Sequence, residues 1–273
     1  MPTLPRITIV TPSFNQATFL ERTIRSVLDQ GYPNLEYIIV DGGSTDGSVD
    51  VIRRYEKHLA WWVSEPDEGQ AQAINKGLRR ATGDWVAWQN SDDVYYPGAF
   101  HELASATTKF HQAGLIIGDV KLIDECDVPF REMRYVTPTY DALRAEGMVL
   151  TNQAAFWRRS AQDTIGLLDE NLHCSFDYDW FLRLIRNVKG AHVPRLWGGL
   201  RYHEATKSST KSEVFTSESQ RILEGREMPA WQIALYRLRR YALLFRLGHF
   251  RYLLRGVSRR VLRTGTGHRL LNE

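Results

Sequence analysis

The sequence predicts an α/β fold whose mostly parallel, Rossmann-like sheet has helices on both faces. The first observation is an alternation of apolar, strand-like segments with helical patterns of about ten to fifteen residues over residues 6–93. The second is a polar, turn-forming cluster at the end of each apolar segment. With 273 residues, 43% of them hydrophobic, the chain is long enough to bury a substantial core.

The first unit is a strand over residues 6–14, "RITIVTPSF", which ends in a Pro-Ser turn. A helix is expected next because apolar residues recur at three- and four-residue steps until Gly31 and Pro33 end the pattern. The apolar positions of this helix are Phe19, Leu20, Ile24, Val27 and Leu28.

Three more units follow the same scheme. The second strand lies at the start of "LEYIIVDGGSTDGS" (35–48), and a helix in "VDVIRRYEK" (49–57) follows it. The third lies in "AWWVSEPDEG" (60–69) and precedes a helix over residues 70–83, and the fourth, "DWVAW", ends in "QNSDD" (89–93). Because ligands of open parallel sheets bind beyond the carboxyl ends of the strands, the four polar strand ends predict one shared pocket. After residue 110 the pattern loosens.

Later elements are expected to be shorter. Strands are predicted within residues 114–123 and 151–157, and a helix over residues 177–188. Trp61, Trp62, Trp85 and Trp88 are expected to pack in the core or on the sheet.

A basic, amphipathic helical extension is expected over residues 211–273. Residues 229–273 hold ten arginines and one acid, a charge of +9, whereas the rest of the chain has a charge of −6. Arginine beside Leu, Tyr, Phe and Trp suits an anionic membrane surface, and packing on the domain or on a second subunit, as in a homodimer, is the alternative. No nucleic-acid-reading motif accompanies the charge, so no nucleic acid partner is expected. The apolar stripe comprises Trp231, Leu235, Leu238, Ala242 and Phe245.

Missing motifs exclude several classes of site. No G-x-G-x-x-G follows the first strand and no G-x-x-x-x-G-K-[ST] occurs, so neither NAD binding nor a P-loop is expected. A diphosphate would then be held through Mg²⁺ or Mn²⁺, which bind carboxylate and phosphate oxygens together. Cys126 and Cys174 match no metal or redox spacing, which suits a reducing cytoplasm. We expect no signal peptide and no membrane-spanning segment.

These motifs are similar to those of glycosyltransferase family 2, the inverting nucleotide-sugar enzymes with a GT-A fold. The chain especially resembles bacterial members that build O-antigen and other surface polysaccharides. The resemblance covers about residues 5–205 and implies a glycosyltransferase domain over residues 1–210. Its nucleotide-sugar half would be about residues 1–120 and its acceptor half about residues 121–210. Residues 211–273 lie outside the resemblance. The blocks that match in order are "ITIVTPSFNQATFLERTIRSVLDQGYPNLEYIIVDGGSTDGS", "SEPDEGQAQAINKGLRRATGDWVAWQNSDDVYYPGAF", "TNQAAFWRR" and "DYDWFLRL".

The resemblance implies a nucleotide-sugar site built from the polar clusters. Asp41 would accept a hydrogen bond from the nucleobase. Asn90, Ser91 and Asp92 stand in the place of the family's DxD motif, with Asp92 as the ligand of Mg²⁺ or Mn²⁺ and an uncharged Asn90 where the first acid is usual. The other residues implied along the nucleotide, ribose and diphosphate are Thr11, Pro12, Ser13, Asn15, Asp67, Gly69 and Asn75.

Asp177 aligns with the catalytic base of the family, although Phe176 replaces the first acid of the E-D motif. Without the resemblance, Asp177 reads as the N-cap of the following helix. Asp179 is expected to be structural. Asp93 either supports its neighbour or caps a helix that begins near Pro97.

Weaker candidates lie in other loops and segments. His203 could approach the metal or the diphosphate, Gln153 and Trp157 could face the acceptor, and Lys207 and Lys211 could reach a phosphate.

The expected function is a metal-dependent, inverting transfer of a sugar from a nucleotide-diphosphate donor, with a UDP-sugar favoured. The acceptor would be a hydroxyl of a glycan or lipid-linked glycan in cell-surface polysaccharide biosynthesis. The expected location is cytoplasmic, on the inner face of the cytoplasmic membrane. Two alternatives are a non-catalytic module that binds a nucleotide-sugar or glycan, favoured by the missing acids at Asn90 and Phe176, and a scaffold recruited to the membrane.

Overall fold

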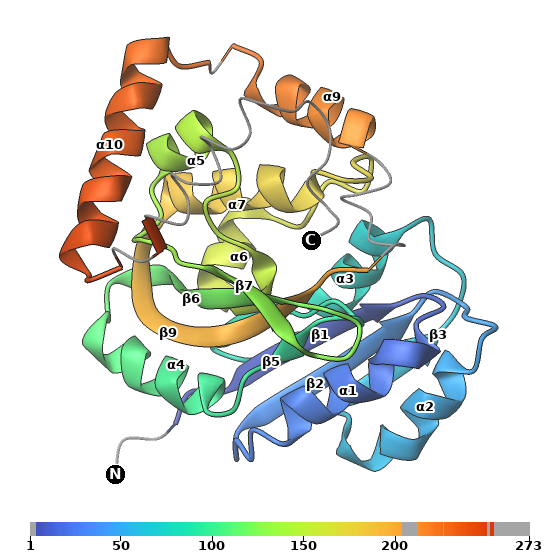
Figure 1. Cartoon of the computed structure of the whole chain (residues 1–273). Helices are drawn as coiled ribbons and strands as arrows, with labels where there is room; N and C mark the ends of the chain where they lie inside the picture. The colour runs from blue at the N-terminus through green and yellow to red at the C-terminus, as the bar shows by residue number, and fades with distance from the viewer. Residues whose placement is uncertain (1–3, 204–211, 226, 250–251, 254–273) are drawn as a thin grey trace.

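A single nine-stranded sheet organises the part of the chain that the computed structural model describes, which is residues 4–203, 212–225, 227–249 and 252–253 (Figure 1). Its strands are β1 (Ile7–Ser13), β2 (Leu35–Asp41), β3 (Trp61–Ser64), β4 (Trp85–Trp88), β5 (Val94–Tyr95), β6 (Ala113–Ile123), β7 (Pro129–Met133), β8 (Ala155–Arg158) and β9 (Lys189–Arg201). Their order is β3-β2-β1-β4-β8-β6-β9-β5, and β7 pairs with β6.

The helices and short 3-10 turns connect these strands. In chain order they are α1 (Ala17–Leu28), α2 (Ser48–Tyr55), η1 (Glu56–His58), α3 (Gln70–Leu78), α4 (Ala99–Lys109), α5 (Tyr140–Glu146), η2 (Asn152–Ala154), α6 (Arg159–Ile165), α7 (Phe176–Asn187), α9 (Ser212–Leu223) and α10 (Ala230–Arg246).

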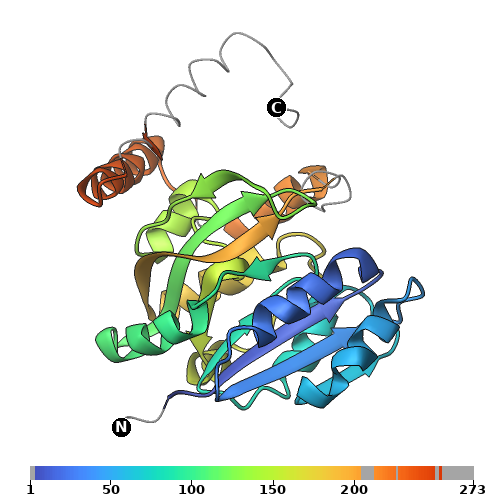
Figure 2. The same ribbon diagram turned by 60° about the horizontal axis from the view of Figure 1, so that its bottom comes forward.

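The first four strands are parallel, as the alternation predicts. β1 pairs with β2 on one side and with β4 on the other, and β2 pairs with β3. Right-handed crossovers place α1 and α2 on one face, because β1 to β3 run in one direction across the sheet. The return from β3 to β4 places α3 on the other face, so helices cover both sides (Figure 2).

Beyond β4 the sheet is mixed rather than parallel. β8 pairs antiparallel with both β4 and β6, β7 returns on β6 through a short hairpin, and β9 runs parallel to β6 before pairing antiparallel with β5. Among the described strands only β6 and β7 form a hairpin, and the other antiparallel pairs join strands that are far apart in the sequence, so the regular spacing of strand and helix is lost here. The predicted α/β fold with helices on both faces is confirmed, and the second half of its sheet adds antiparallel pairs beside the parallel β6–β9 pair.

β9 has no counterpart among the predicted strands. Its sequence, "KGAHVPRLWGGLR", contains a proline and three glycines, which are weak strand formers. The glycines allow close packing: a Cβ added at Gly198 would lie 2.2 Å from the carbonyl oxygen of Gln153. On the facing strand, a Cβ at Gly118 would lie 2.5 Å from the Trp197 ring.

An aromatic cluster forms the core under β4 and β8. The rings of Trp88, Trp157 and Trp180 are fully buried, with centroids 4.5 to 5.6 Å apart. Trp85 is also buried, with the Arg158 guanidinium over its ring, and Trp61 and Trp62 are half-buried on the edge strand. The prediction that Trp157 faces the acceptor is therefore wrong, because its ring packs inside the sheet's own core.

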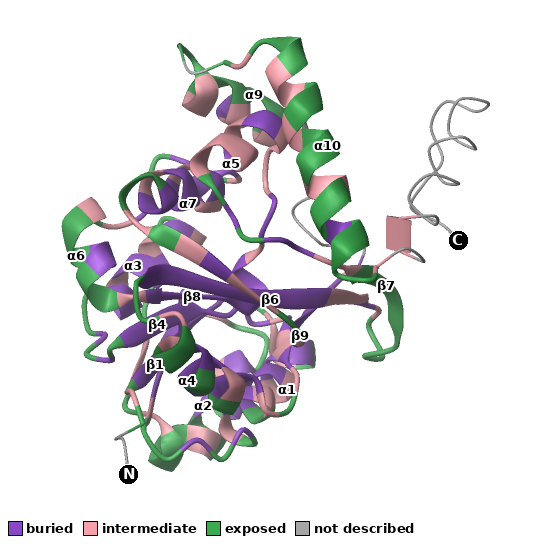
Figure 3. Cartoon of the chain, turned by 90° about the vertical axis from the view of Figure 1, so that its left-hand side faces the viewer, coloured by how far each residue is buried: buried purple, intermediate pink, exposed green. Residues whose placement is uncertain are grey.

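The extension begins with α9, and α10 packs its polar side on α5. Tyr236 donates a hydrogen bond to Asp141 at 2.8 Å, and Arg240 forms an ion pair with Glu146 at 3.0 Å. Leu244 is fully buried, whereas the outward face of α10 is exposed (Figure 3). No helix in the described residues is long and apolar enough to span a membrane.

Candidate active site

A cavity of about 600 Å³ lies at the edge of the sheet where β1 and β4 end. Its walls come from the end of β1, the first turn of α3, the turn after β4, η2, the start of α7, the end of β9 and α9. The polar clusters that follow β1, β3 and β4 line it, whereas the cluster that follows β2 does not. The structure thus brings three of the four clusters into one pocket.

Most of the site residues implied by the resemblance line this cavity, and two of the weaker candidates join them. The lining residues among the predicted set are Pro12, Ser13, Asp67, Gly69, Asn90, Ser91, Asp92 and Asp177, together with Gln153 and His203. Lys207 and Lys211 lie outside the described residues.

Asp41 is fully buried and holds the loop after β2 instead of lining the cavity. Its carboxylate accepts hydrogen bonds from the N–H groups of Gly43 and Ser44 at 3.1 and 2.9 Å, and from the Ser64 hydroxyl at 2.7 Å. These contacts give Asp41 a structural role in the loop after β2, and its contact with a nucleobase, implied by the resemblance, stays a prediction. Thr11 is likewise buried and outside the lining.

Asn75 and Asn15 also lie outside the lining. The Asn75 amide donates to the Leu168 carbonyl at 3.0 Å and to the Glu170 carboxylate at 2.8 Å, and it accepts from the Leu168 N–H at 3.0 Å. Asn15 accepts from the Thr45 N–H at 2.9 Å. Both side chains therefore hold neighbouring segments together by hydrogen bonds. The contacts with the nucleotide implied for Asn15, and with the ribose and diphosphate for Asn75, stay predictions.

Asp93 holds the turn after β4 in place through hydrogen bonds. Its buried carboxylate accepts hydrogen bonds from the Asn90 amide at 2.9 Å, the Gln153 amide at 2.6 Å and the Arg201 N–H at 2.8 Å. Burial, and then the neighbouring Asp92, raise the pKa of Asp93 well above its usual value. The N-cap of α4 is Gly98, so of the two roles left open for Asp93 the supporting one is observed.

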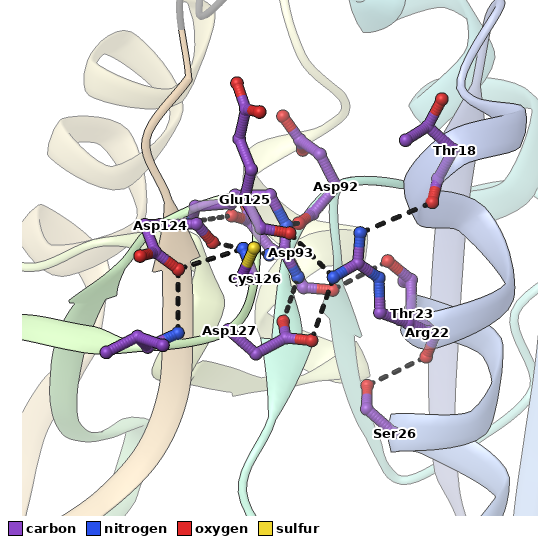
Figure 4. A network of polar contacts seen from close by, with 12 residues as sticks. Thr18, Arg22, Thr23, Ser26, Asp92, Asp93, Asp124, Glu125, Cys126 and Asp127 are labelled. Atoms are coloured by element: carbon purple, nitrogen blue, oxygen red, sulfur yellow. Dashed lines mark hydrogen bonds and ion pairs between the residues drawn. The ribbon is translucent and has the colours of Figure 1, made fainter.

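Arg201 fixes the backbone of the same turn, and no sequence motif pointed to it. Its buried guanidinium donates to the carbonyl oxygens of Asp92 and Asp124, each at 2.7 Å, and pairs with Asp127. Arg22 of α1 reaches the same hairpin, donating to Asp127 at 3.0 Å (Figure 4). The β6–β7 hairpin is thereby tied to the turn that presents the Asp92 carboxylate.

Asp92 projects its carboxylate from this turn and lies 3.1 Å from the Nε2 atom of His203. Both residues line the cavity. Within the described residues no group of three or more His, Cys, Asp or Glu side chains could hold a metal ion. The Asp92 carboxylate fits Mg²⁺ or Mn²⁺ when substrate phosphates and water complete the coordination, which is usual for these ions, whereas imidazole is not a ligand that Mg²⁺ prefers.

Asp177 faces the cavity from the first turn of α7. The N-cap of that helix is Ser175, so Asp177 is not the cap that its sequence position alone suggested. Burial, and then the negative charge of Glu218, raise the pKa of Asp177 to about 6. Asp179 forms an ion pair with Arg183 at 2.8 Å, which agrees with its expected structural role.

Comparison with known proteins gives matches at the level of family and fold. A sequence profile described as "Glycosyl transferase family 2" matches residues 8–166. A putative teichuronic acid biosynthesis glycosyltransferase of Bacillus subtilis, TuaG, is 45% identical over 96 residues, covering 33% of this chain and 37% of TuaG. An uncharacterized glycosyltransferase of Rickettsia typhi is 25% identical over 194 residues, covering 67% of this chain and 59% of that protein. The matches thus span well under two thirds of these relatives' own lengths.

Solved structures share the fold. S. aureus TarS (residues 1–349) in complex with UDP-GlcNAc superposes with a TM-score of 0.66 at 17% sequence identity, covering 80% of this chain and 65% of that one. A mannosyltransferase from Pyrobaculum calidifontis, in complex with GDP-Man and Mn²⁺, superposes with a TM-score of 0.56 at 22% identity, covering 75% and 59%. At these identities the likeness establishes the fold, and the GT-A prediction is confirmed.

Proposed function

Because the chain belongs to glycosyltransferase family 2, we propose that it is an inverting enzyme that transfers a sugar from a nucleoside-diphosphate donor to a hydroxyl group. The observation that supports this most strongly is that Asp92, from the first half of the fold, and Asp177, from the second, line one cavity. A diphosphate anchor and a base within one cavity are what a displacement at the anomeric carbon needs.

The donor would lie along the wall formed by β1, α3 and the turn after β4. Pro12 and Ser13 would line the nucleotide. The residues that would lie near its ribose and diphosphate are Asp67, Gly69, Asn90 and Ser91. A UDP-sugar is favoured. TarS, which shares the fold, is solved with UDP-GlcNAc, and the P. calidifontis mannosyltransferase with GDP-Man.

Asp92 would hold Mg²⁺ or Mn²⁺, with His203 beside it as the second protein ligand or as a hydrogen-bond partner. When bound, the cation would stabilise the negative charge that develops on the departing nucleoside diphosphate. The uncharged Asn90 amide donates to Asp93 and accepts from Gln70 at 2.9 Å, so it fixes the turn and adds no charge to the ion.

Asp177 would act as the general base. It would take the proton of the acceptor hydroxyl as that oxygen attacks the anomeric carbon on the face opposite the diphosphate, and this single displacement inverts the anomeric centre. A pKa of about 6 leaves the carboxylate ionised at neutral pH and makes it a stronger base than an exposed aspartate.

The acceptor we propose is a glycan or lipid-linked glycan of a cell-surface polysaccharide. The support is the name of TuaG, a putative teichuronic acid biosynthesis enzyme that is 45% identical over its matched segment. We place the reaction on the cytoplasmic side of the membrane, where nucleotide-sugars are made.

Thermal denaturation in the presence of nucleotide-sugars tests donor binding without knowledge of the acceptor. At least one nucleotide-sugar should raise the melting temperature in the presence of Mn²⁺ or Mg²⁺, and the increase should be lost when EDTA is added. A ligand at a hundredfold excess over its Kd stabilises a protein by about 2.7 kcal/mol, which is readily measured. Equal melting temperatures with every UDP-, GDP- and dTDP-sugar would contradict the proposed site.

The outward face of α10 should bind anionic membranes. Trp231, Leu238 and Phe245 are 66%, 65% and 62% exposed, and they lie on the face opposite the contacts with α5. Arginines flank the stripe, and each base near an anionic surface contributes about 1 kcal/mol. Replacing these three residues by alanine should lower co-sedimentation with phosphatidylglycerol vesicles at least about tenfold, since three large apolar side chains are lost.

The matched control is alanine at Leu243 and Leu247, which are also exposed but lie off the stripe. Their replacement should leave vesicle binding nearly unchanged. Salt-insensitive binding, or equal binding by both variants, would refute the membrane assignment. A halved mass of the stripe variant in sedimentation velocity would instead assign the stripe to a homodimer interface.

A further inference from the structure

α9 lies beyond the segment that matches the family, yet it reaches the active-site cavity. Its Phe215 lines the cavity together with Cys174, Phe176 and Asp177. The helix packs on α7 (Figure 1). The residues that join the two helices are therefore candidates for a role in the reaction.

Glu218 of α9 is the centre of this contact. Its side chain is buried, and one carboxylate oxygen accepts a hydrogen bond from the His173 N–H at 2.9 Å. The other oxygen accepts from the N–H groups of Cys174 and Ser175 at 2.9 and 2.8 Å. Three consecutive backbone amides are thus held by one side chain from a distant part of the sequence.

Ser175 adds a second connection between the loop and α9. Its hydroxyl lies 3.2 Å from the Phe215 carbonyl oxygen and 3.1 Å from the Ser219 hydroxyl. As the N-cap of α7, Ser175 makes no side-chain hydrogen bond to its own helix. Glu218 thus provides the acceptors for the three amides that lead into α7, and a negative charge is favoured near a helix N-terminus.

Asp177 lies two residues after Ser175, and the loop that ends at Ser175 determines where its carboxylate points into the cavity. We propose that Glu218 is a positioning residue for the catalytic base: by binding the three amides of residues 173–175, it fixes the start of α7 and thereby the Asp177 carboxylate. The inference rests on the proposed function, since it assigns to Asp177 the role of base.

The charge of Glu218 has a second effect on Asp177. The amides of residues 173–175 lower the pKa of Glu218, so this carboxylate is ionised. Its negative charge adds to burial in raising the pKa of Asp177. The other titratable side chains at this contact are those of His173 and Cys174. Glu218 therefore contributes to both the position and the basicity of Asp177.

Glu218→Gln tests the inference, because glutamine has the same shape but presents an amide donor where one acceptor oxygen was. We expect kcat to fall at least about tenfold while the KM for the donor stays within about twofold, because the donor contacts lie on other elements. The acid limb of the kcat profile should move to lower pH, and the amides of residues 173–175 should exchange hydrogen faster than in the wild type. Metal-dependent thermal stabilisation by the donor should persist.

Glu213→Gln is the matched control, because Glu213 lies exposed on the same helix. It should change neither kcat nor amide exchange. If Glu218→Gln does not fold, Glu218→Asp, which keeps the charge on a shorter side chain, should show the same separation of kcat from KM in a milder form.

An unchanged kcat in folded Glu218→Gln, or unchanged amide exchange at residues 173–175, would overturn the inference. So would a loss of donor binding equal to the loss of kcat, since that would indicate general damage to the cavity. Failure of the proposed function has a different signature: the wild type itself would show no turnover, while the exchange measurement would still decide whether Glu218 holds the loop.

Discussion

Asp177→Asn is expected to lower kcat by about a thousandfold while leaving the affinity for the donor within about twofold. Asparagine keeps the shape of the side chain and removes the only group in the described cavity wall that we assign to proton removal. The contacts proposed for the donor come from other elements than α7, so its Kd should not depend on this carboxylate. The measurement is single-turnover transfer together with calorimetric titration of the donor.

The pH dependence of the wild type supports or refutes the same assignment. Because the pKa of Asp177 is raised to about 6, the base is protonated and inactive below that pH and becomes active as the pH rises through it. The rate should therefore rise between about pH 5 and 7, and the residual rate of Asp177→Asn should lack this limb.

Asp179→Asn is the control, since Asp179 lies two residues further along α7 and pairs with Arg183. It should keep nearly full kcat with a small loss of stability. A wild-type kcat in Asp177→Asn would refute the base assignment. Unchanged donor binding with no turnover even in the wild type would favour the non-catalytic module, the alternative suggested by Phe176 in place of an acid.

Asp92→Asn should weaken metal-dependent donor binding by at least about a hundredfold, because a carboxylate that shares a divalent ion with a diphosphate is replaced by a neutral amide. His203 alone would then remain beside the ion. Titration of the donor with Mn²⁺ and with EDTA separates the effects: wild type and variant should bind equally weakly in EDTA and differ only with the metal.

The comparison of donor binding in Mn²⁺ and in EDTA also distinguishes the loss of a metal ligand from damage to the turn after β4. Asp92 contributes its carbonyl oxygen to Arg201 through the backbone, and this contact is kept in the variant. An Asp92→Asn protein that binds the donor as the wild type does in Mn²⁺ would contradict the metal assignment. A variant that loses binding equally in Mn²⁺ and in EDTA would point to a damaged turn.

The sequence was sufficient for the elements with regular periodicity. The parallel strands β1 to β4 and the helices between them follow alternating patterns with clear turn residues, and α7 begins within one residue of its predicted start. β9 could not be predicted in this way, because its glycines and proline are required by close contacts with distant residues, such as Gln153. Those contacts exist only in the folded chain.

The candidate site shows the same limit. The family resemblance singled out Asp92 and Asp177, and in the structure both line one cavity. It also implied ligand contacts for Asp41 and Asn75, whose side chains instead form hydrogen bonds within the fold. Arg201 could not have been found, because its role depends on reaching across from β9 to the turn after β4.

The two helices of the extension, α9 and α10, differ in how far their roles could be predicted from the sequence. The stripe of Trp231, Leu238 and Phe245 was visible as a helical period and is exposed in the structure. α9 gave no such signal, although Glu218 contacts the loop that precedes α7. The domain boundary expected at residue 210 stays a prediction. Because α9 contacts the cavity, residues after this boundary contribute to the candidate site.

Release of nucleoside diphosphate from the nucleotide-sugar that stabilises the protein most, followed in Mn²⁺ for the wild type and Asp177→Asn, tests the central claim most directly. The account predicts that both proteins bind this donor and that only the wild type releases nucleoside diphosphate, slowly to water and faster when a lipid-linked glycan acceptor is added. Equal release by the two proteins, or no release from any nucleotide-sugar by a wild type that binds one, would contradict it.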